Sequence, residues 1–189
     1  MNQKIFVIDN FLEAPLGYYD KIDSGNRSRG LESVDNPPDL EKTYPEEVVF
    51  DKISDALRSN IKVLESKDHV QKERDRSPIC CHMGSDYIGV LYLSLPLSNW
   101  GEFGVKFYSH KETGLDSYPT QEQIQKYNIT NIGNTFCQNL ENWKEYGSIP
   151  VKHNRIVLFR SNLWHSYGNG FGSDLNTSML YKKIIIKNG

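Results

Sequence analysis

Two histidines far apart in the sequence are the residues best suited to chemistry. His82 comes just before the apolar run YIGVLYLSLPL, and His165 ends the run RIVLFRSNLWH. Imidazole is the commonest metal ligand in proteins, because it is neutral near pH 7 and offers a nitrogen lone pair. If two strands bring these rings together inside a small β-barrel, we expect them to hold one metal ion.

The segment CCHMGSD, from Cys80 to Asp86, offers further ligands. Side chains two residues apart share one face of a strand, so Cys80 and His82 are expected to point the same way. Asp86 lies beyond a Gly-Ser pair and could turn back toward His82. The sequence therefore leaves two ligand sets open, Cys80 with His82 or His82 with Asp86. The remaining histidines are expected to be solvated: His69, His110 and His153.

The elements that must position these residues are mainly strands. IFVIDNF opens the chain as a strand, YIGVLYLSLPL, KFYSHKETG and IPVKHNRIVLFRS supply the middle strands, and SMLYKKIIIK closes it. A helix is predicted over residues 12–24, and helical character is expected within the polar insertion of residues 117–145, around 121–127 and 135–146. Apolar residues at three- and four-residue spacing predict another helix, with this stripe: Val49, Ile53, Leu57, Ile61 and Leu64.

This order of elements predicts the fold class. Strands separated by turn signals, without parallel βαβ alternation, favour an α+β domain over residues 1–189, with a barrel or jelly roll and N-terminal supporting helices. The formal net charge of −2 argues against general nucleic-acid binding. No apolar run approaches the roughly 20 residues that a membrane helix needs. Asp9 interrupts a signal-peptide pattern, and three cysteines, an odd number, favour a reducing cytoplasm.

Taken in order, four segments resemble a known family: IFVIDNFLEAP, YIGVLYLSLP, WGEFGVKFYSHKETG and NRIVLFRSNLWHSYGNGFG. They are similar to iron(II)- and 2-oxoglutarate-dependent oxygenases of the double-stranded β-helix (jelly-roll, cupin-like) fold, especially small bacterial and phage members. The resemblance spans almost the whole chain. It implies a dioxygenase that binds Fe(II) and 2-oxoglutarate and hydroxylates or halogenates a substrate that the sequence does not identify.

The chain departs from the family at the metal ligands. The family has a His-x-Asp pair and a distant histidine, and His165 matches the distant one. If His82 takes the first position, Gly84 stands where the carboxylate is expected, as in the family's halogenases. If Cys80 takes it, His82 replaces the carboxylate, and the softer Cys/His/His set favours zinc or copper. The third ligand is therefore Asp86, Cys80 or an exogenous halide.

A second departure concerns 2-oxoglutarate, whose far carboxylate the family binds with an arginine. The expected stretch reads NTSML, so the resemblance assigns this role to Lys182 or Lys183, together with Tyr92 on the VLYL strand. Arg155 and Arg160 are the other basic candidates. Two alternatives follow from the departures. One is a degenerate member of the fold that binds a ligand or partner, and the other is a non-oxidative cupin-like protein with zinc on Cys80, His82 and His165.

Overall fold

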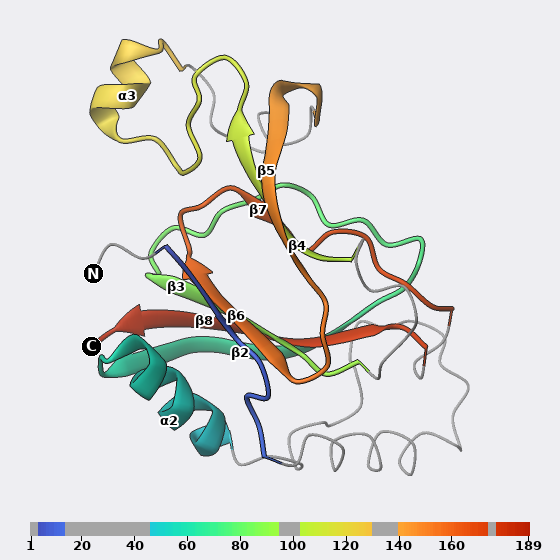
Figure 1. The fold of residues 1–189 in the computed structure, drawn as a ribbon. Coiled ribbons are helices and arrows are strands. Elements are labelled where there is room, and N and C mark those ends of the chain that lie inside the picture. Colours follow the sequence, from blue (N-terminus) through green and yellow to red (C-terminus); the bar gives the residue numbers. More distant parts are fainter. Residues whose placement is uncertain (1–3, 14–45, 95–102, 130–139, 174–176) are drawn as a thin grey trace.

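The computed structural model describes residues 4–13, 46–94, 103–129, 140–173 and 177–189 (Figure 1). Strands dominate, and they form two antiparallel sheets. The larger sheet has the order β1 (Ile5–Ile8), β6 (Arg155–Arg160), β3 (Tyr87–Tyr92), β8 (Met179–Asn188) and β2 (Ile61–Gln71). The smaller sheet has the order β5 (Trp143–Pro150), β4 (Gly104–His110) and β7 (His165–Ser166). The predicted strands are confirmed.

Helix α2 (Glu46–Leu57) is shorter than its apolar stripe predicted. The chain turns at Arg58, which has a φ of 51°, and Ile61 already begins β2. The β-branched residues Ile61 and Val63 pair with β8 instead of continuing the helix. The helix predicted over residues 12–24 falls almost entirely outside the described residues.

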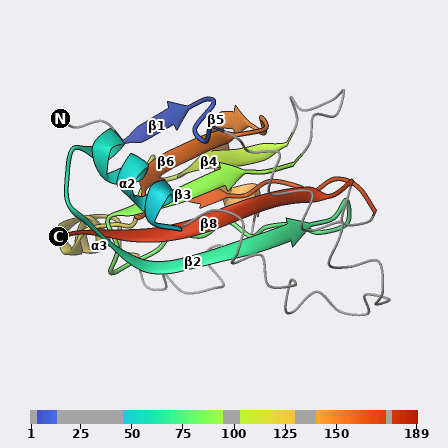
Figure 2. The ribbon, with the colours of Figure 1, turned by 90° about the horizontal axis from the view of Figure 1, so that it is seen from below.

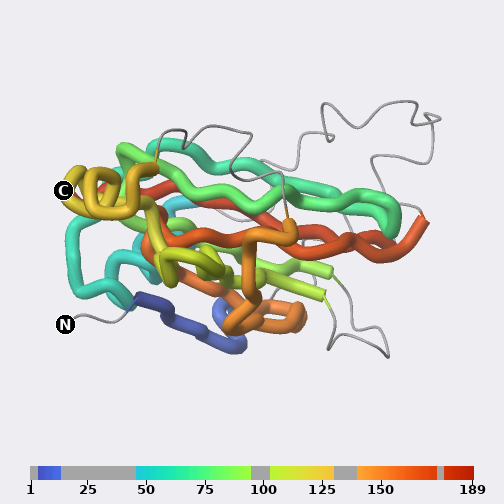
Figure 3. Tube along the Cα trace, turned by 90° about the horizontal axis from the view of Figure 1, so that it is seen from above, coloured from blue at the N-terminus to red at the C-terminus, as the bar shows by residue number. Residues whose placement is uncertain are grey.

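The insertion between β4 and β5 contains one of its two expected helices. Helix α3 (Gln121–Lys126) begins with a capping box, in which Thr120 and Gln123 bind each other's backbone N–H groups. The helix expected over residues 135–146 is wrong in its described part, because only the 3-10 turn η2 (Leu140–Asn142) precedes β5. Figure 3 shows α3 at the same end of the molecule as the C-terminus.

The large sheet has an apolar layer on each face. Alternate residues of its strands, such as Leu91 and Leu158, pack with Val49 and Ile53 of α2, which lies across this sheet (Figure 2). The intervening residues face the small sheet, where they pack against Val105 and Phe107 of β4: Ile88, Val90, Tyr92, Val157, Phe159, Met179 and Tyr181. Within the described residues, no helix is long and apolar enough to cross a membrane.

A β-bulge changes the alternation of β2. The pairing with β8 runs from Ile61 to Val63 and resumes at Glu65, so Leu64 is the extra residue. Before the bulge, Ile61 and Val63 face the helix side. After it, Glu65 and His69 lie opposite Ile185 and Tyr181 and face the small sheet.

Candidate metal centre

Three of the four predicted ligands meet at one point. Their ligand atoms, on Cys80, His82 and His165, all lie within 4.8 Å of one another. Cys80 and His165 form an antiparallel bridge, in which each backbone N–H donates to the other's carbonyl, at 2.8 and 2.9 Å. His82 is tied to the same region by its backbone N–H, which donates to the carbonyl of Ser161. The backbone thus brings together three side chains with lone pairs suited to a metal.

The ring of His165 is held in the form that a metal ligand needs. The residue is fully buried, and its Nδ1 lies 2.8 Å from the carbonyl oxygen of Leu163, so Nδ1 carries the proton. Its Nε2 therefore offers a lone pair toward Cys80, whose sulfur lies 3.7 Å away. Burial lowers the pKa of His165 to about 3, which keeps the imidazole neutral.

The electrostatic surroundings keep His82 neutral as well. Burial lowers the pKa of this imidazole, and the charge of Lys183 acts in the same direction. The rings of His82 and His165 are nearly parallel, with centroids 5.7 Å apart. Neutral imidazoles are required for metal binding, since protonation removes the lone pair.

The distances fit a metal ion of the size that proteins bind through sulfur and nitrogen. With metal–sulfur bonds of about 2.3 Å and metal–nitrogen bonds of about 2.0–2.1 Å, a tetrahedral site separates these atoms by about 3.6 Å. The observed separation between Cys80 Sγ and His165 Nε2 is 3.7 Å. Cys80 and His165 are therefore already spaced to share one metal ion, and the ligand atom of His82 lies within 4.8 Å of both.

Asp86, the fourth predicted ligand, does not join the cluster. Its Oδ2 accepts a hydrogen bond of 2.9 Å from the backbone N–H of Asn188, and its own N–H donates to Ile186. The loop does not fold back as the Asp86 alternative required, because Asp86 is bonded to β8 through both its backbone and its side chain, next to Tyr87, where the β3–β8 ladder begins. Gly84 lies in the same loop with a φ of 86° and open space where a Cβ would stand.

The structure places Lys182 and Lys183 on opposite faces of β8. The ammonium of Lys182 lies 3.3 Å from carboxylates of both Glu46 and Asp68, on the side of α2. Lys182 is therefore not brought to the cluster, because successive side chains on a strand alternate between its faces. Lys183 shares the face of Tyr181 and pairs with Glu65 at 2.9 Å. Its charge lowers the pKa of both His82 and His165.

Tyrosines and a histidine line the interior next to the cluster. The hydroxyl of Tyr92, predicted to bind the cofactor, accepts the backbone N–H of Val105 at 2.9 Å. The ring of Tyr167 stacks on Tyr181, at 5.4 Å, and meets the edge of His165, at 5.5 Å. Burial raises the pKa of the Tyr167 hydroxyl, and a negative charge on Cys80 acts in the same direction.

Two buried polar atoms on the rings that stack on Tyr181 have no hydrogen-bond partner among the described residues. They are the hydroxyl of Tyr167 and Nε2 of His69. His69 was expected to be solvated, but it stacks on Tyr181 at 5.2 Å, and burial lowers its pKa. Buried polar atoms usually find partners, so these two indicate a place where a polar ligand or water completes the site.

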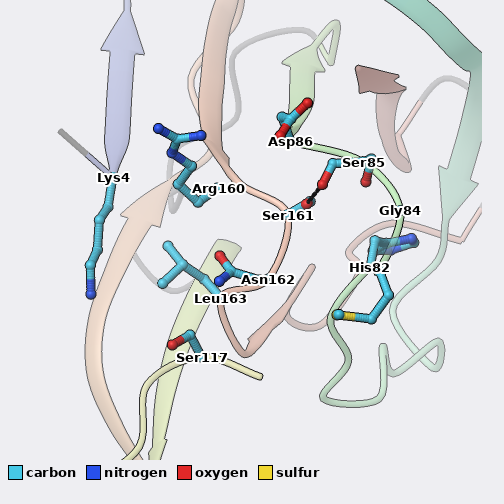
Figure 4. A pocket seen from close by; sticks show the side chains of 11 residues that line it. Lys4, His82, Gly84, Ser85, Asp86, Ser117, Arg160, Ser161, Asn162 and Leu163 are labelled. Atoms are coloured by element: carbon cyan, nitrogen blue, oxygen red, sulfur yellow. Dashed lines mark hydrogen bonds between the residues drawn. The ribbon is translucent and has the colours of Figure 1, made fainter. Parts of the chain in front are cut away.

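A pocket of about 450 Å³ borders the cluster on its outer side (Figure 4). It is lined by the loop that follows His82, by the residues that follow β6, and by Lys4 and Ser117. Figure 4 shows the imidazole of His82 on one wall and Arg160 on the opposite side. One residue, His82, therefore belongs to both the pocket and the cluster.

Comparisons with known proteins were made by sequence and by structure. A scan of protein-family models finds no match, and a search of curated proteins finds no relative. HygX from Streptomyces hygroscopicus, solved with nickel and 2-oxoglutarate bound, aligns with a TM-score of 0.58 and 11% identity, over 98% of this chain and 83% of its own. The chain shares the fold of this protein. At such low identity the likeness establishes the fold alone.

Two further structures support the same assignment of fold. SnoN, a non-heme alpha ketoglutarate dependent epimerase from nogalamycin biosynthesis, aligns with a TM-score of 0.56 and 10% identity, over 98% of this chain and 78% of its own. SnoK, a carbocyclase of the same biosynthesis and the same cofactor dependence, aligns with a TM-score of 0.55 and 10% identity, over 98% of this chain and 80% of its own. The structural neighbours are thus iron- and 2-oxoglutarate-dependent enzymes.

Proposed function

We propose that the chain is an iron(II)- and 2-oxoglutarate-dependent oxygenase built as one double-stranded β-helix domain. One observation carries the proposal: Cys80, His82 and His165 meet within 4.8 Å on this fold. Structural neighbours were solved with iron, or with nickel and 2-oxoglutarate, bound. The strand order of the two antiparallel sheets supports the jelly-roll arrangement.

Each ligand has a counterpart in the triad that the family resemblance implies. Cys80 and His82 stand at the two positions of the His-x-Asp pair, since Cys80 is the residue that bridges His165. Neutral His165 completes the set from β7, with its proton held by the carbonyl of Leu163. Iron(II) bound there would supply the redox chemistry, coupling the reduction of O₂ to the oxidation of 2-oxoglutarate and substrate.

The chain's own residues would orient the cosubstrate. The ammonium of Lys183 lies on the interior face, and it would bind the far carboxylate of 2-oxoglutarate in competition with Glu65, now 2.9 Å away. The unpartnered hydroxyl of Tyr167 and Nε2 of His69 would supply further hydrogen bonds. Binding would then satisfy polar groups that are otherwise buried at a cost.

Hydroxylation is favoured over halogenation by the ligand count. A halide is needed only where the protein leaves a ligand position empty, as Gly84 would if His82 stood first in the motif. Cys80 supplies a third protein ligand here, and its ligand atom lies within 4.8 Å of those of both histidines. We therefore assign Cys80, rather than Asp86 or a halide, as the third ligand.

The test is spectroscopic and chemical. Iron(II) and 2-oxoglutarate added to the anaerobic protein should give a weak visible charge-transfer band, and air should then yield succinate. The His165→Ala variant should give neither, because it removes a ligand without touching the pocket. A wild-type protein that forms no band and no succinate, while correctly folded, would refute the proposal.

A zinc protein of the same fold is the second candidate, and the donor set favours it. Thiolate and imidazole are preferred zinc ligands, and the 3.7 Å separation between Cys80 Sγ and His165 Nε2 matches a tetrahedral site. Metal analysis of the purified protein separates the two candidates. Stoichiometric zinc that resists exchange by iron(II), and that disappears in Cys80→Ser, would support zinc.

A further inference from the structure

The pocket beside His82 combines this half-buried member of the cluster with one basic side chain, Arg160, that has no ion-pair partner among the described residues. We propose that this pocket binds a carboxylate or phosphate group of the substrate through the guanidinium of Arg160. The inference rests on the proposed function for its meaning, since it names the class of substrate. Its physical basis, an anion site on Arg160, can be tested without iron or 2-oxoglutarate.

Arg160 is held in a fixed orientation at the end of β6. Its backbone N–H donates to the carbonyl of Lys4, and its guanidinium carbon lies 4.5 Å from the centre of the Tyr87 ring. Stacking fixes the plane of the guanidinium and leaves its N–H groups directed outward at the edges. A guanidinium in this state binds the paired oxygens of a carboxylate or phosphate with two parallel hydrogen bonds.

The other charged residues of the pocket already have partners. Lys4 pairs with Asp116 at 2.7 Å, outside the metal cluster. Asp86 accepts the backbone N–H of Asn188 at 2.9 Å. Among the described residues, no carboxylate forms an ion pair with Arg160, so this is the pocket cation that lacks a counterion.

Neutral polar groups complete the surroundings of an anion. Ser117 and Asn162 line the pocket and can donate hydrogen bonds, while the buried hydroxyl of Ser85 finds no partner in the described part of the chain. Met83, which is 63% exposed, and Leu163 give the same pocket an apolar side. The lining therefore suits an organic acid or phosphate ester, with its acid group among the donors.

The position of His82 connects this anchor to the metal centre. A molecule that fills the pocket and binds Arg160 must also pass along the wall formed by His82, because that residue lines the pocket (Figure 4). The part of the substrate away from its acid group would then lie next to the cluster. Arg160 is thus assigned a role in positioning the substrate rather than in the reaction itself.

Inorganic phosphate is a suitable probe, because it carries only the group in question. We would follow ¹H–¹⁵N spectra of the metal-free protein during a titration with phosphate, against chloride at equal ionic strength. Saturable shifts should appear for the amides of Ser117 and Asn162. Arg160→Gln should weaken this binding at least tenfold, whereas Arg74→Gln, a change at an exposed arginine away from the pocket, should leave it unchanged.

A conservative variant keeps the test valid if Arg160→Gln disturbs the packing on Tyr87. Arg160→Lys retains the charge without the two-pronged geometry, so we expect a loss smaller than that of Arg160→Gln and larger than that of Arg74→Gln. Wild-type protein without saturable shifts, or Arg160 variants that bind phosphate like the wild type, would overturn the inference. Phosphate binding lost on Arg160→Gln in a protein that forms no succinate would instead reject only the proposed oxygenase.

Discussion

The sulfur of Cys80 lies 3.7 Å from Nε2 of His165, and the backbones of the same two residues exchange both hydrogen bonds of an antiparallel bridge. Because directly opposite residues of an antiparallel pair point to the same face, their side chains lie together before any metal binds. Site geometry that the backbone fixes in this way lowers the free-energy cost of ordering the ligands on binding. Metal binding should therefore stabilise the folded protein rather than reshape it.

The adjacent cysteines provide a matched test of the cluster. Cys80→Ala should abolish the rise in melting temperature that iron(II) or zinc gives the wild type, a stabilisation of about 2.7 kcal/mol at a hundredfold excess over Kd. Cys81→Ala should retain that rise, because Cys81 packs with Ile79 and Trp164 on the other face. Equal metal responses of the two variants would exclude Cys80 as a ligand.

Restoring the His-x-Asp pair tests the assignment of positions. In the double variant Cys80→His/His82→Asp, an imidazole replaces the thiolate and a carboxylate replaces the imidazole. Both new donors are harder than the ones they replace, so iron(II) affinity should rise relative to zinc. Competition between the two metals, measured by metal analysis after dialysis, gives the ratio. The variant His82→Asp alone is the control, since it changes one donor and leaves the thiolate. A ratio that does not change in the double variant would argue against the proposed positions.

The two lysines of β8 should separate cosubstrate binding from stability. Lys183→Met should raise the Kd for 2-oxoglutarate at least tenfold, a loss of about 1.4 kcal/mol, because it removes the ammonium proposed to bind the far carboxylate. Lys182→Met should leave that Kd unchanged. It should instead lower the free energy of unfolding by roughly 2 kcal/mol, since the carboxylate of Asp68, whose side chain is 9% exposed, loses one of its charged hydrogen-bond partners. Calorimetric titration measures the Kd, and denaturant unfolding measures the stability. Weaker 2-oxoglutarate binding in Lys182→Met, with unchanged binding in Lys183→Met, would contradict the proposed role of Lys183.

Tyr167→Phe should affect stability and binding in opposite directions. Removing a buried hydroxyl that has no partner in the described residues should stabilise the ligand-free protein by about 1 kcal/mol. The same change should weaken the binding of 2-oxoglutarate, because the ligand loses a hydrogen-bond donor. Tyr181→Phe, on the stacked neighbour, is the comparison for ring packing alone. A Tyr167→Phe protein that is less stable than the wild type would mean that the hydroxyl already has a partner.

The ion pairs of Asp9 predict an acid-dependent contribution to stability. Hydrogen bonds from Arg155 and Lys152 lower the pKa of Asp9 from 3.8 to about 2. A carboxyl group with a lowered pKa stabilises the fold above pH 4, and this stabilisation is lost as the pH falls toward 2. Because Asp9 is 36% exposed, we expect Asp9→Asn to cost less than about 1 kcal/mol at pH 7. Unfolding curves should show a larger difference at pH 7 than at pH 2, and an equal difference at both would contradict the assignment.

The sequence predicted the cluster better than its surroundings. His82 and His165 follow from their place at the ends of apolar runs, and Cys80 follows from two-residue alternation with His82. The choice between Lys182 and Lys183 could not be made in this way, because both stand in one continuous strand with apolar residues on both faces. Only pairing with β3, which places Lys183 opposite Val90, fixes the face of each lysine.

The errors in the elements have a related cause. The stripe from Val49 to Leu64 suits a helix through its whole length, yet Ile61 and Val63 gain more by pairing with β8 than by extending α2. Local periodicity does not contain that long-range gain. The prediction that His69 is solvated was wrong for the same reason. It rested on the charged residues next to His69 in the sequence, whereas the ring stacks on Tyr181 of the neighbouring strand.

Leu64 lies 47% exposed at the bulge of β2 and belongs neither to the metal cluster nor to the pocket lining. Deletion of Leu64 would remove the bulge, so that side chains would alternate between the two faces without interruption along β2. One half of the strand would then point its side chains to the opposite face of the sheet. Either Ile61 and Val63 would no longer pack on the side of α2, or the carboxylate of Glu65 would point away from Lys183. The side chains that β2 presents toward the cluster thus depend on one inserted residue whose own side chain is a hydrocarbon.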